Sequence, residues 1–168
     1  MKPCIIFCAA GFDGLLSPIP GDALVIAADG GLRHTRKLNI NPDGILGDFD
    51  SLGFVPEGAQ VFPVEKDDTD AMLAACKGLQ LGYREFLLYG SLDGPRLDHT
   101  IANFQTLQYL ADHGARGYLV GLNYIVTVVK EEAIRFEKDA SGILSLFCLG
   151  PGNQPGQGNG KSGGGQNE

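Results

Sequence analysis

The sequence has no excess of basic residues, no long apolar run and no signal-peptide cleavage pattern. Its 13 lysines and arginines stand against 20 aspartates and glutamates, a formal net charge of −7, whereas binding a nucleic-acid backbone needs a face rich in basic side chains. No apolar stretch approaches the roughly 20 residues that span a bilayer, and residues 1–10 lack the pattern that marks a secreted chain. These absences predict a cytoplasmic protein that binds neither nucleic acid nor membrane.

Cysteine pairs of the CxxC type are also missing. Cys4, Cys8, Cys76 and Cys148 form no CxxC pair, and none of them lies near a cluster of histidines. Zinc sites and disulfide frameworks both depend on such spacings. We therefore expect ordinary buried thiols, because a free cysteine packs as a small hydrophobic residue.

The composition, 43% hydrophobic and 20% charged over 168 residues, is that of a folded chain with a core of its own. Short apolar runs, typical of buried strands, alternate with helical patterns up to about residue 122. This alternation predicts an α/β domain with a largely parallel sheet flanked by helices, a Rossmann-like three-layer arrangement. The expected strands cover 4–9, 24–28, 44–46, 60–63, 85–89 and 117–120, and the expected helices cover 30–38, 69–81 and 97–113.

The pattern changes after residue 122. Residues 123–129, 133–136 and 142–149 are strand-like without helical periods, which predicts the incomplete beginning of a β-sandwich domain over 123–149. Residues 150–168 are rich in Gly, Gln and Asn, with no aliphatic or aromatic side chain. Such a segment buries no apolar surface, so we expect a flexible tail.

Two acidic groups directly follow expected strands. Asp29, Gly30 and Gly31 come after the run at 24–28, where glycines let a backbone approach a phosphate at a helix start; a plain turn has the same sequence. Asp48 and Asp50 come after the run at 44–46, and residues two apart in extended backbone point the same way. Their carboxylates can therefore converge on Mg²⁺, which prefers oxygen ligands, although solvated turn residues remain an alternative.

A third group opens the helix expected over 69–81. One acceptor, such as the hydroxyl of Thr69 or a neighbouring carboxylate, is enough to cap a helix. Capping does not explain the crowding of Asp67, Asp68 and Asp70 beside Lys66, because the extra carboxylates repel one another. Asp67 and Asp70 are three residues apart and share a face once the helix begins. A bound cation offsets their repulsion, and Lys66 can meet a phosphate as a point charge.

A fourth group enters the helix expected over 97–113. Arg96, His99 and Asn103 fall on one side at helical spacing, which favours a ligand surface, although a solvated helix face has the same pattern. Asp98 projects in a different direction. On this interpretation the opposite side is the buried stripe, formed by Leu97, Ile101, Phe104, Leu107 and Ala111.

The four motifs ADGG, GDFDS, KDDTD and GxRLDHxxxN, in this order between residues 28 and 103, resemble those of thiamine pyrophosphokinase. The resemblance covers the family's α/β catalytic domain. It implies transfer of a pyrophosphoryl group from ATP to the hydroxyethyl oxygen of thiamine, giving thiamine diphosphate and AMP. It further implies a homodimer, which in the family depends on a second, β-sandwich domain.

The resemblance also implies roles for individual residues, carried over by position. Asp48, Asp50, Asp67 and Asp70 are expected Mg²⁺ ligands. Arg96 is an expected phosphate contact, and Asp98 or Asp70 is the candidate acceptor of the alcohol proton, with neither preferred. The expected nucleotide or phosphate contacts are Asp29, Gly30, Gly31, Lys66, Thr69, Arg96, His99 and Asn103.

The sequence departs from the family after Leu149, where the Gly-rich segment stands in place of the β domain that supplies part of the thiamine site. A natural short variant and a shifted reading frame both account for this. Two other functions stay open. Asp48 and Asp50 after an apolar strand resemble the nucleophile loop of haloacid dehalogenase-type phosphohydrolases, and a noncatalytic module that binds nucleotide and Mg²⁺ fits the missing domain.

Overall fold

The computed structural model describes residues 2–47, 60–61 and 69–148. The chain divides into a compact unit over Met1–Ala133 and a second unit over Ile134–Glu168. Within the described ranges, no helix is long and apolar enough to cross a membrane.

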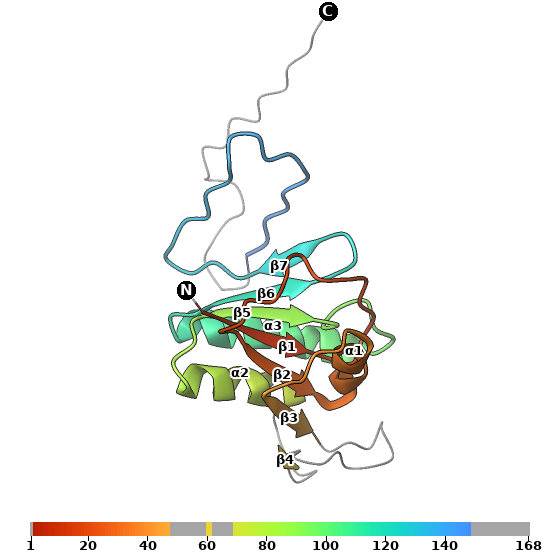
Figure 1. The fold of residues 1–168 in the computed structure, drawn as a ribbon. Helices are drawn as coiled ribbons and strands as arrows, with labels where there is room; N and C mark the ends of the chain where they lie inside the picture. Colours follow the sequence, from red (N-terminus) through yellow and green to blue (C-terminus); the bar gives the residue numbers. More distant parts are fainter. Residues whose placement is uncertain (1, 48–59, 62–68, 149–168) are drawn as a thin grey trace, which may run out of the picture. The chain divides into compact units, whose positions relative to one another are not determined.

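The first unit is an α/β fold built on one sheet of seven strands (Figure 1), in the order β4-β3-β2-β1-β5-β6-β7. Neighbouring strands are parallel except β6 and β7, which are antiparallel. The mostly parallel sheet that the sequence predicted is confirmed. The strands are β1 (Pro3–Phe7), β2 (Leu24–Ala28), β3 (Gly44–Gly47), β4 (Gln60–Val61), β5 (Glu85–Tyr89), β6 (Arg116–Val120) and β7 (Ile125–Thr127).

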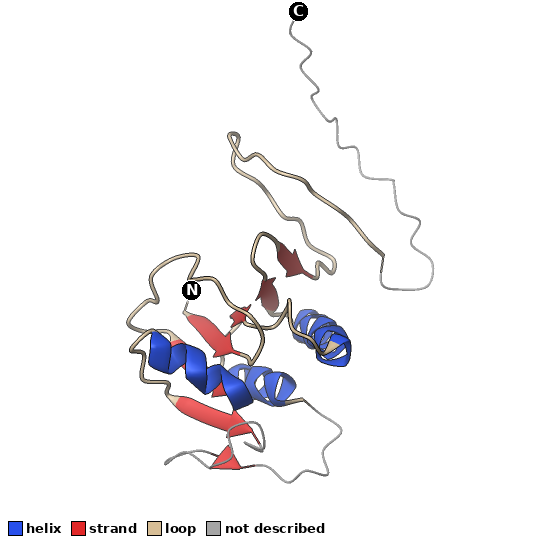
Figure 2. Cartoon of the chain, turned by 90° about the vertical axis from the view of Figure 1, so that its right-hand side faces the viewer, coloured by secondary structure: helices blue, strands red, loops and turns tan. Residues whose placement is uncertain are grey.

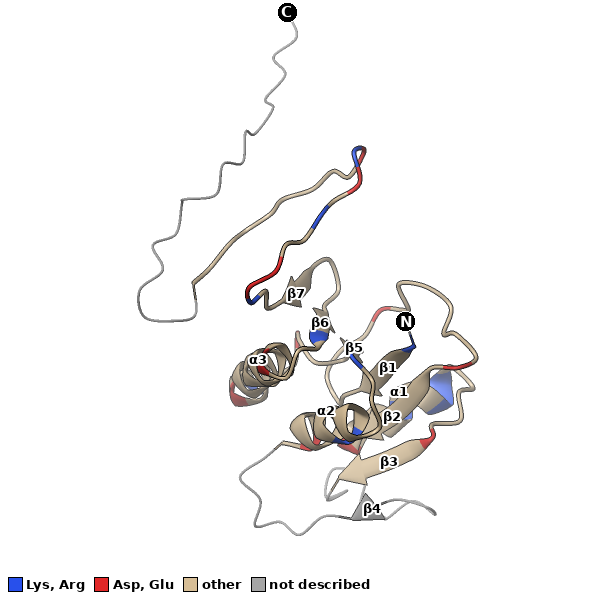
Figure 3. Cartoon of the chain, turned by 90° about the vertical axis from the view of Figure 1, so that its left-hand side faces the viewer, with Lys and Arg blue, Asp and Glu red and all other residues tan. Residues whose placement is uncertain are grey.

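The helices lie on both faces of the sheet (Figure 3), as the three-layer prediction requires. They are α1 (Leu32–Lys37), preceded by the 3₁₀ turn η1 (Asp29–Gly31), α2 (Asp70–Gln80) and α3 (Leu97–Asp112). The helix expected over 30–38 is therefore divided into a 3₁₀ turn and a short α-helix. Alternate residues of β1 separate two cores: Ile6 packs with α2 and α3, whereas Ile5 and Phe7 pack with residues of the β1–β2 connection.

The residues after β6 differ from the prediction in two ways. β7, which the sequence assigned to the start of a β domain, pairs with β6, with Val120 opposite Ile125, and extends the sheet of the first unit. Residues 133–136 and 142–148, expected as strands, contain none (Figure 2). A strand needs a neighbour for its backbone N–H and C=O groups, and no strand pairs with these residues in the described part of the chain.

Candidate functional site

The order of the strands changes direction between β1 and β5. The chain adds β2, β3 and β4 on one side of β1 and then β5, β6 and β7 on the other. In open α/β sheets, ligands bind beyond the carboxyl ends of the strands where this reversal occurs. The segments after β1, β2, β5 and β6 all emerge at this end and define the candidate site.

The segments that follow β1 and β5 are joined through their backbones. The N–H of Cys8 donates to the carbonyl of Tyr89 at 2.8 Å, and the N–H of Ala10 donates to the carbonyl of Gly90 at 2.8 Å. Gly90 has a φ of +63°, and a Cβ there would lie 2.6 Å from the carbonyl oxygen of Cys8. Only glycine permits both this conformation and this approach, so Gly90 sets the path of the chain at the centre of the site.

The glycines of the ADGG motif have a packing role. Gly30 and Gly31 are both buried, and a Cβ on Gly31 would lie 1.8 Å from the carbonyl oxygen of Phe7. The motif therefore presses η1 against the end of β1. Asp29, at a φ of 44°, is only partly buried. A contact of these three residues with a nucleotide stays a prediction.

The start of α2 lies at the same end of the sheet. The hydroxyl of Thr69 accepts a hydrogen bond from the N–H of Met72 at 3.3 Å, so Thr69 caps the helix. Asp70, in the first turn, is close enough to affect the buried thiol of Cys8 beyond β1. Burial, and to a smaller extent the negative charge of Asp70, raises the pKa of Cys8 to about 12. A carboxylate in this position fits the oxygen ligands that Mg²⁺ takes.

Three of the four predicted metal ligands are not among the residues that the structure describes. Asp48, Asp50 and Asp67, together with Lys66, lie outside the described residues. Where the chain is described, no three His, Cys, Asp or Glu side chains are grouped as a metal site.

Arg96 and Asp98, at the start of α3, form an exposed double hydrogen bond. The Nε of Arg96 donates to Oδ1 of Asp98 at 3.0 Å, and its second guanidinium nitrogen donates to Oδ2. This hydrogen bonding lowers the pKa of Asp98 to about 2. A carboxylate with so low a pKa is a poor proton acceptor. Asp98 can act as a base only after Arg96 has turned toward another anion, such as a phosphate.

The predicted orientation of α3 is wrong in part, although Leu107 is buried and Phe104 packs against the core as expected. Leu97 and Ile101, expected in the core, are 71% and 53% exposed, whereas Asn103, expected on the ligand face, is only 6% exposed. The helix packs against Gly117 on β6, where a Cβ would lie 2.7 Å from Leu107 and 2.7 Å from Leu110. The helix therefore turns its Asn103 side toward the sheet, with Thr106, Leu107 and Leu110.

Asn103 consequently acts on the backbone of the site. Its Nδ2 donates to the carbonyl of Ser91 at 2.7 Å, and the hydroxyl of Ser91 donates to the carbonyl of Leu88 at 2.8 Å. These bonds hold the start of the β5–α3 loop, residues 90–96. His99, one turn before Asn103, is exposed, because this end of the helix extends past the strands.

Several site residues were missed at the level of sequence. His34 contacts the carbonyl of Ala10 through Nε2 at 2.8 Å, and Phe12 packs edge-on to both His34 and Tyr89. These contacts anchor the beginning of the β1–β2 connection. No local pattern indicates them, because each joins residues distant in sequence. Asp93 and Tyr124 were likewise not expected in the site. The Asp-Gly pair at 93–94 signals a turn, but a turn signal does not indicate which residue Asp93 contacts.

A small cavity of about 200 Å³ opens between the β1–β2 connection and the β6–β7 turn. Apolar side chains form most of its wall and Asp13 adds a carboxylate, an arrangement that suits the apolar part of a small ligand. It is lined by Phe12, Asp13, Gly14, Leu15, Leu16, Val120, Gly121 and Leu122.

The comparisons with known proteins agree on one family. The family model described as thiamin pyrophosphokinase, catalytic domain, matches residues 19–119. The thiamine pyrophosphokinase of Bacillus subtilis is similar at 26% identity and a TM-score of 0.57, over 71% of this chain and 60% of that one. The enzyme of Geobacillus thermodenitrificans is similar at 26% identity and a TM-score of 0.54, over 71% and 59%.

A more distant structure, thiamin pyrophosphokinase from Candida albicans, shares the fold at 14% identity and a TM-score of 0.52, over 74% of this chain and 59% of that one. None of the curated proteins matches the sequence. The chain spans about 60% of the length of the solved structures that it resembles.

Proposed function

Because the chain belongs to the thiamin pyrophosphokinase family, we propose that it transfers the pyrophosphoryl group of ATP to thiamine in a Mg²⁺-dependent reaction, giving thiamine diphosphate and AMP. The observation that carries the proposal is the family match over residues 19–119. Asp29, Asp70 and the β5–α3 loop all lie at the carboxyl end of the sheet, which supports the proposal.

The reaction balances without a further reactant. The hydroxyl oxygen of thiamine attacks the β-phosphorus of ATP, the bond from that phosphorus to the bridging oxygen of the α-phosphate breaks, and AMP leaves. The alcohol proton passes to a carboxylate, for which Asp70 and Asp98 both remain candidates. Asp98 serves only if the phosphate draws Arg96 away from it, because their hydrogen bonds keep its pKa at about 2.

We assign the metal to Asp70 with Asp48, Asp50 and Asp67. Mg²⁺ bound there supplies positive charge that stabilises the negative charge developing on the phosphate oxygens. Arg96 and Lys66 contact phosphate. The remaining nucleotide contacts are Asp29, Gly30, Gly31, Thr69 and His99, whereas Asn103 acts through the Ser91 backbone that it holds.

A homodimer in the cytoplasm completes the proposal. This chain spans about 60% of the length of the family relatives, so thiamine binding is tested separately from nucleotide binding. A noncatalytic module that binds nucleotide and Mg²⁺ is the second candidate. Membership of the thiamin pyrophosphokinase family argues against the alternative function, a haloacid dehalogenase-type phosphohydrolase.

The deciding assay incubates the full chain with ATP and Mg²⁺, with and without thiamine, and measures AMP by chromatography. We expect AMP only with thiamine, and none after chelation of the metal. Calorimetric binding of Mg²⁺-ATP without AMP formation would favour the noncatalytic module. Release of inorganic phosphate from small phosphoesters would favour the phosphohydrolase.

A further inference from the structure

Two segments far apart in sequence are bonded to each other at the carboxyl end of the sheet. The carboxylate of Asp93, in the β5–α3 loop, accepts a hydrogen bond from the hydroxyl of Tyr124 at 2.7 Å. It accepts another from the N–H of Leu122 at 3.2 Å. Both donors belong to the β6–β7 turn, residues 121–124. One carboxylate thus joins two of the segments that define the candidate site.

A backbone hydrogen bond and the pairing of β6 with β7 fix the turn that makes this contact. The N–H of Gly121 donates to the carbonyl of Tyr124 at 2.9 Å, directly beyond the paired residues Val120 and Ile125 of β6 and β7. A Cβ on Gly121 would lie 2.9 Å from Cζ of Tyr124 and 3.1 Å from Oδ2 of Asp93. The missing side chain of Gly121 therefore leaves the space in which the carboxylate and the phenol meet.

The backbone of Asp93 indicates that the contact determines the loop conformation. Its φ is 60°, in the left-handed region that costs energy for any residue except glycine. The following Gly94 lies against Ala10, where a Cβ would approach the Cβ of Ala10 to 2.9 Å. The carboxylate's two hydrogen bonds offset the cost of this conformation.

The charge on the carboxylate strengthens the bond to the phenol. The hydrogen bond to Asp93 raises the pKa of Tyr124, so the phenol keeps the proton that it donates. A Tyr124 hydroxyl that remains protonated can hold the loop throughout the neutral range.

The position of Asp93 in the loop explains what the contact can do. Asn103 holds the start of the loop through Ser91, and Arg96 stands at its end, just before α3. Asp93 lies between them, three residues before the guanidinium that is assigned to phosphate. Because Asp93 is held in the middle of the β5–α3 loop, the guanidinium of Arg96 can reach fewer positions.

We propose that Asp93 and Tyr124 are positioning residues, which order the β5–α3 loop so that Arg96 meets the phosphate in the reacting geometry. The effect on turnover rests on the proposed function, whereas the effect on the loop does not. Two experiments on the full chain therefore separate them.

The first experiment measures amide hydrogen exchange over residues 91–99 in the free protein. We expect Tyr124→Phe and Asp93→Gly to speed exchange there by about tenfold. Asp93→Asn keeps one of the two acceptor oxygens and loses the charge, so its exchange should fall between that of the wild type and that of Asp93→Gly. Glycine accepts the φ of Asp93, so Asp93→Gly removes the carboxylate without adding strain. Unchanged exchange in both Tyr124→Phe and Asp93→Gly would overturn the proposal.

The matched control is Tyr118→Phe. It also removes one hydroxyl from a tyrosine, but Tyr118 lines the cavity at the opposite end of the sheet. Its exchange over residues 91–99 and its turnover should equal those of the wild type. Equal acceleration in Tyr118→Phe and Tyr124→Phe would show a general loosening of the fold and would also overturn the proposal.

The second experiment measures thiamine-dependent AMP formation. Misplacement of Arg96 should lower kcat by about tenfold with a change in the KM for ATP of less than about twofold, and Asp93→Asn should lose less of kcat than Asp93→Gly. The double variant Asp93→Gly/Tyr124→Phe should be no slower than the worse single variant, because both lose the same contact. Full kcat in both single variants, or independent losses that multiply, would contradict the positioning role.

A wild-type chain that forms no AMP would refute the proposed function and with it the effect on turnover. The exchange experiment would then decide alone whether Asp93 and Tyr124 order the loop.

Discussion

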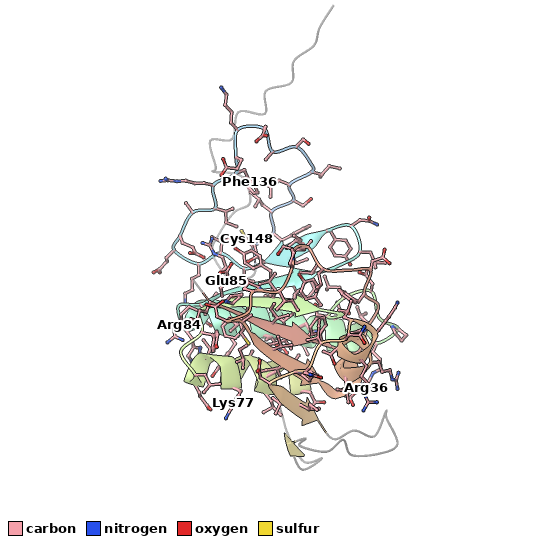
Figure 4. The ribbon with its side chains drawn as sticks, viewed as in Figure 1. Arg36, Lys77, Arg84, Glu85, Phe136 and Cys148 are labelled. Atoms are coloured by element: carbon pink, nitrogen blue, oxygen red, sulfur yellow. The ribbon has the colours of Figure 1, made fainter. Side chains whose placement is uncertain are left out.

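The two ends of the sheet are built differently. At the amino end, charged side chains form ion pairs at the surface. Arg116 donates to Glu132 through Nε at 3.2 Å, and Lys130 lies 2.6 Å from Asp112. Arg84, labelled in Figure 4 beside Glu85 at the start of β5, donates to the carbonyls of Leu79 and Tyr83. A cavity of about 430 Å³ there is lined in part by Arg84, Arg116, Lys130 and Glu132.

At the carboxyl end, backbones approach one another and side chains hold loops. Gly31 and Gly90 lie against carbonyls at the end of β1, and Asn103 is buried where its side chain donates to a backbone carbonyl. Buried polar groups cost stability unless hydrogen bonds offset that cost. We infer from this contrast that the residues at the amino end stabilise the fold, whereas those at the carboxyl end are arranged to bind a ligand.

The sharpest test of this contrast is the removal of a carboxylate from each end. Asp70→Asn should lower thiamine-dependent AMP formation by about 100-fold or more, because it removes charge from the proposed metal site. We expect the same of Asp50→Asn, with the fold intact by circular dichroism. Asp112→Asn at the amino end is the control and should keep full activity. Similar activity in Asp70→Asn and Asp112→Asn would remove Asp70 from the site.

A second test compares glycines at the two ends. Gly31→Ala places a Cβ 1.8 Å from a backbone oxygen, so it should destabilise the protein by about 3 kcal/mol or more. Gly114→Ala, at a φ of +66° with nothing within 4 Å, adds only backbone strain, about 1 kcal/mol. Urea unfolding of both variants measures the difference. Equal losses would show that the close approach at Gly31 is relieved by movement of η1.

A third test uses the titration of Asp98. Its pKa is about 2 because Arg96 hydrogen-bonds to it; a folded-state pKa below the unfolded value stabilises the fold above about pH 4, and this contribution is lost as the pH falls toward 2. Arg96→Gln should return the pKa of Asp98 toward its ordinary value, measured by NMR of the side-chain carboxyl. Asp112, whose pKa Lys130 and Gln108 lower, should not change in that variant. An unaltered Asp98 titration would mean that the pair does not form in solution.

The smallest effect is expected from an ion pair at the amino end. Lys130→Gln breaks the contact with Asp112. Both partners are exposed, so the free energy of unfolding should be nearly unchanged. AMP formation should be unchanged. A large loss of activity from this variant would contradict the division of roles between the two ends.

The secondary structure of the first unit was largely predictable from local sequence. The strands at Leu24–Ala28 and Glu85–Tyr89 lie where their apolar runs placed them, because a strand covered on both faces is apolar at nearly every position. Thr69 was recognisable as a helix cap for a similarly local reason. The expected strands after residue 132 were not found, because apolar character alone provides no pairing partner.

The candidate site was less predictable. The motifs placed Asp29, Asp70 and Arg96 at helix starts that follow strands, and the structure has them there. Helical periodicity misplaced Asn103, because the apolar residues of α3 allow more than one buried face and Gly117 on another element selects between them. The bond from Tyr124 to Asp93 spans 31 residues of sequence and left no local signal.

The sequence by itself thus determined the elements, their order and the motifs that identify the family, since these depend on residues close together along the chain. Only the tertiary structure decided which face of α3 is buried, why Gly31 and Gly90 must be glycine, and which groups hold the loop before Arg96. These depend on the register of the strands and on contacts between distant segments, which bring Asp93 and Tyr124 within hydrogen-bonding distance at the same end of the sheet.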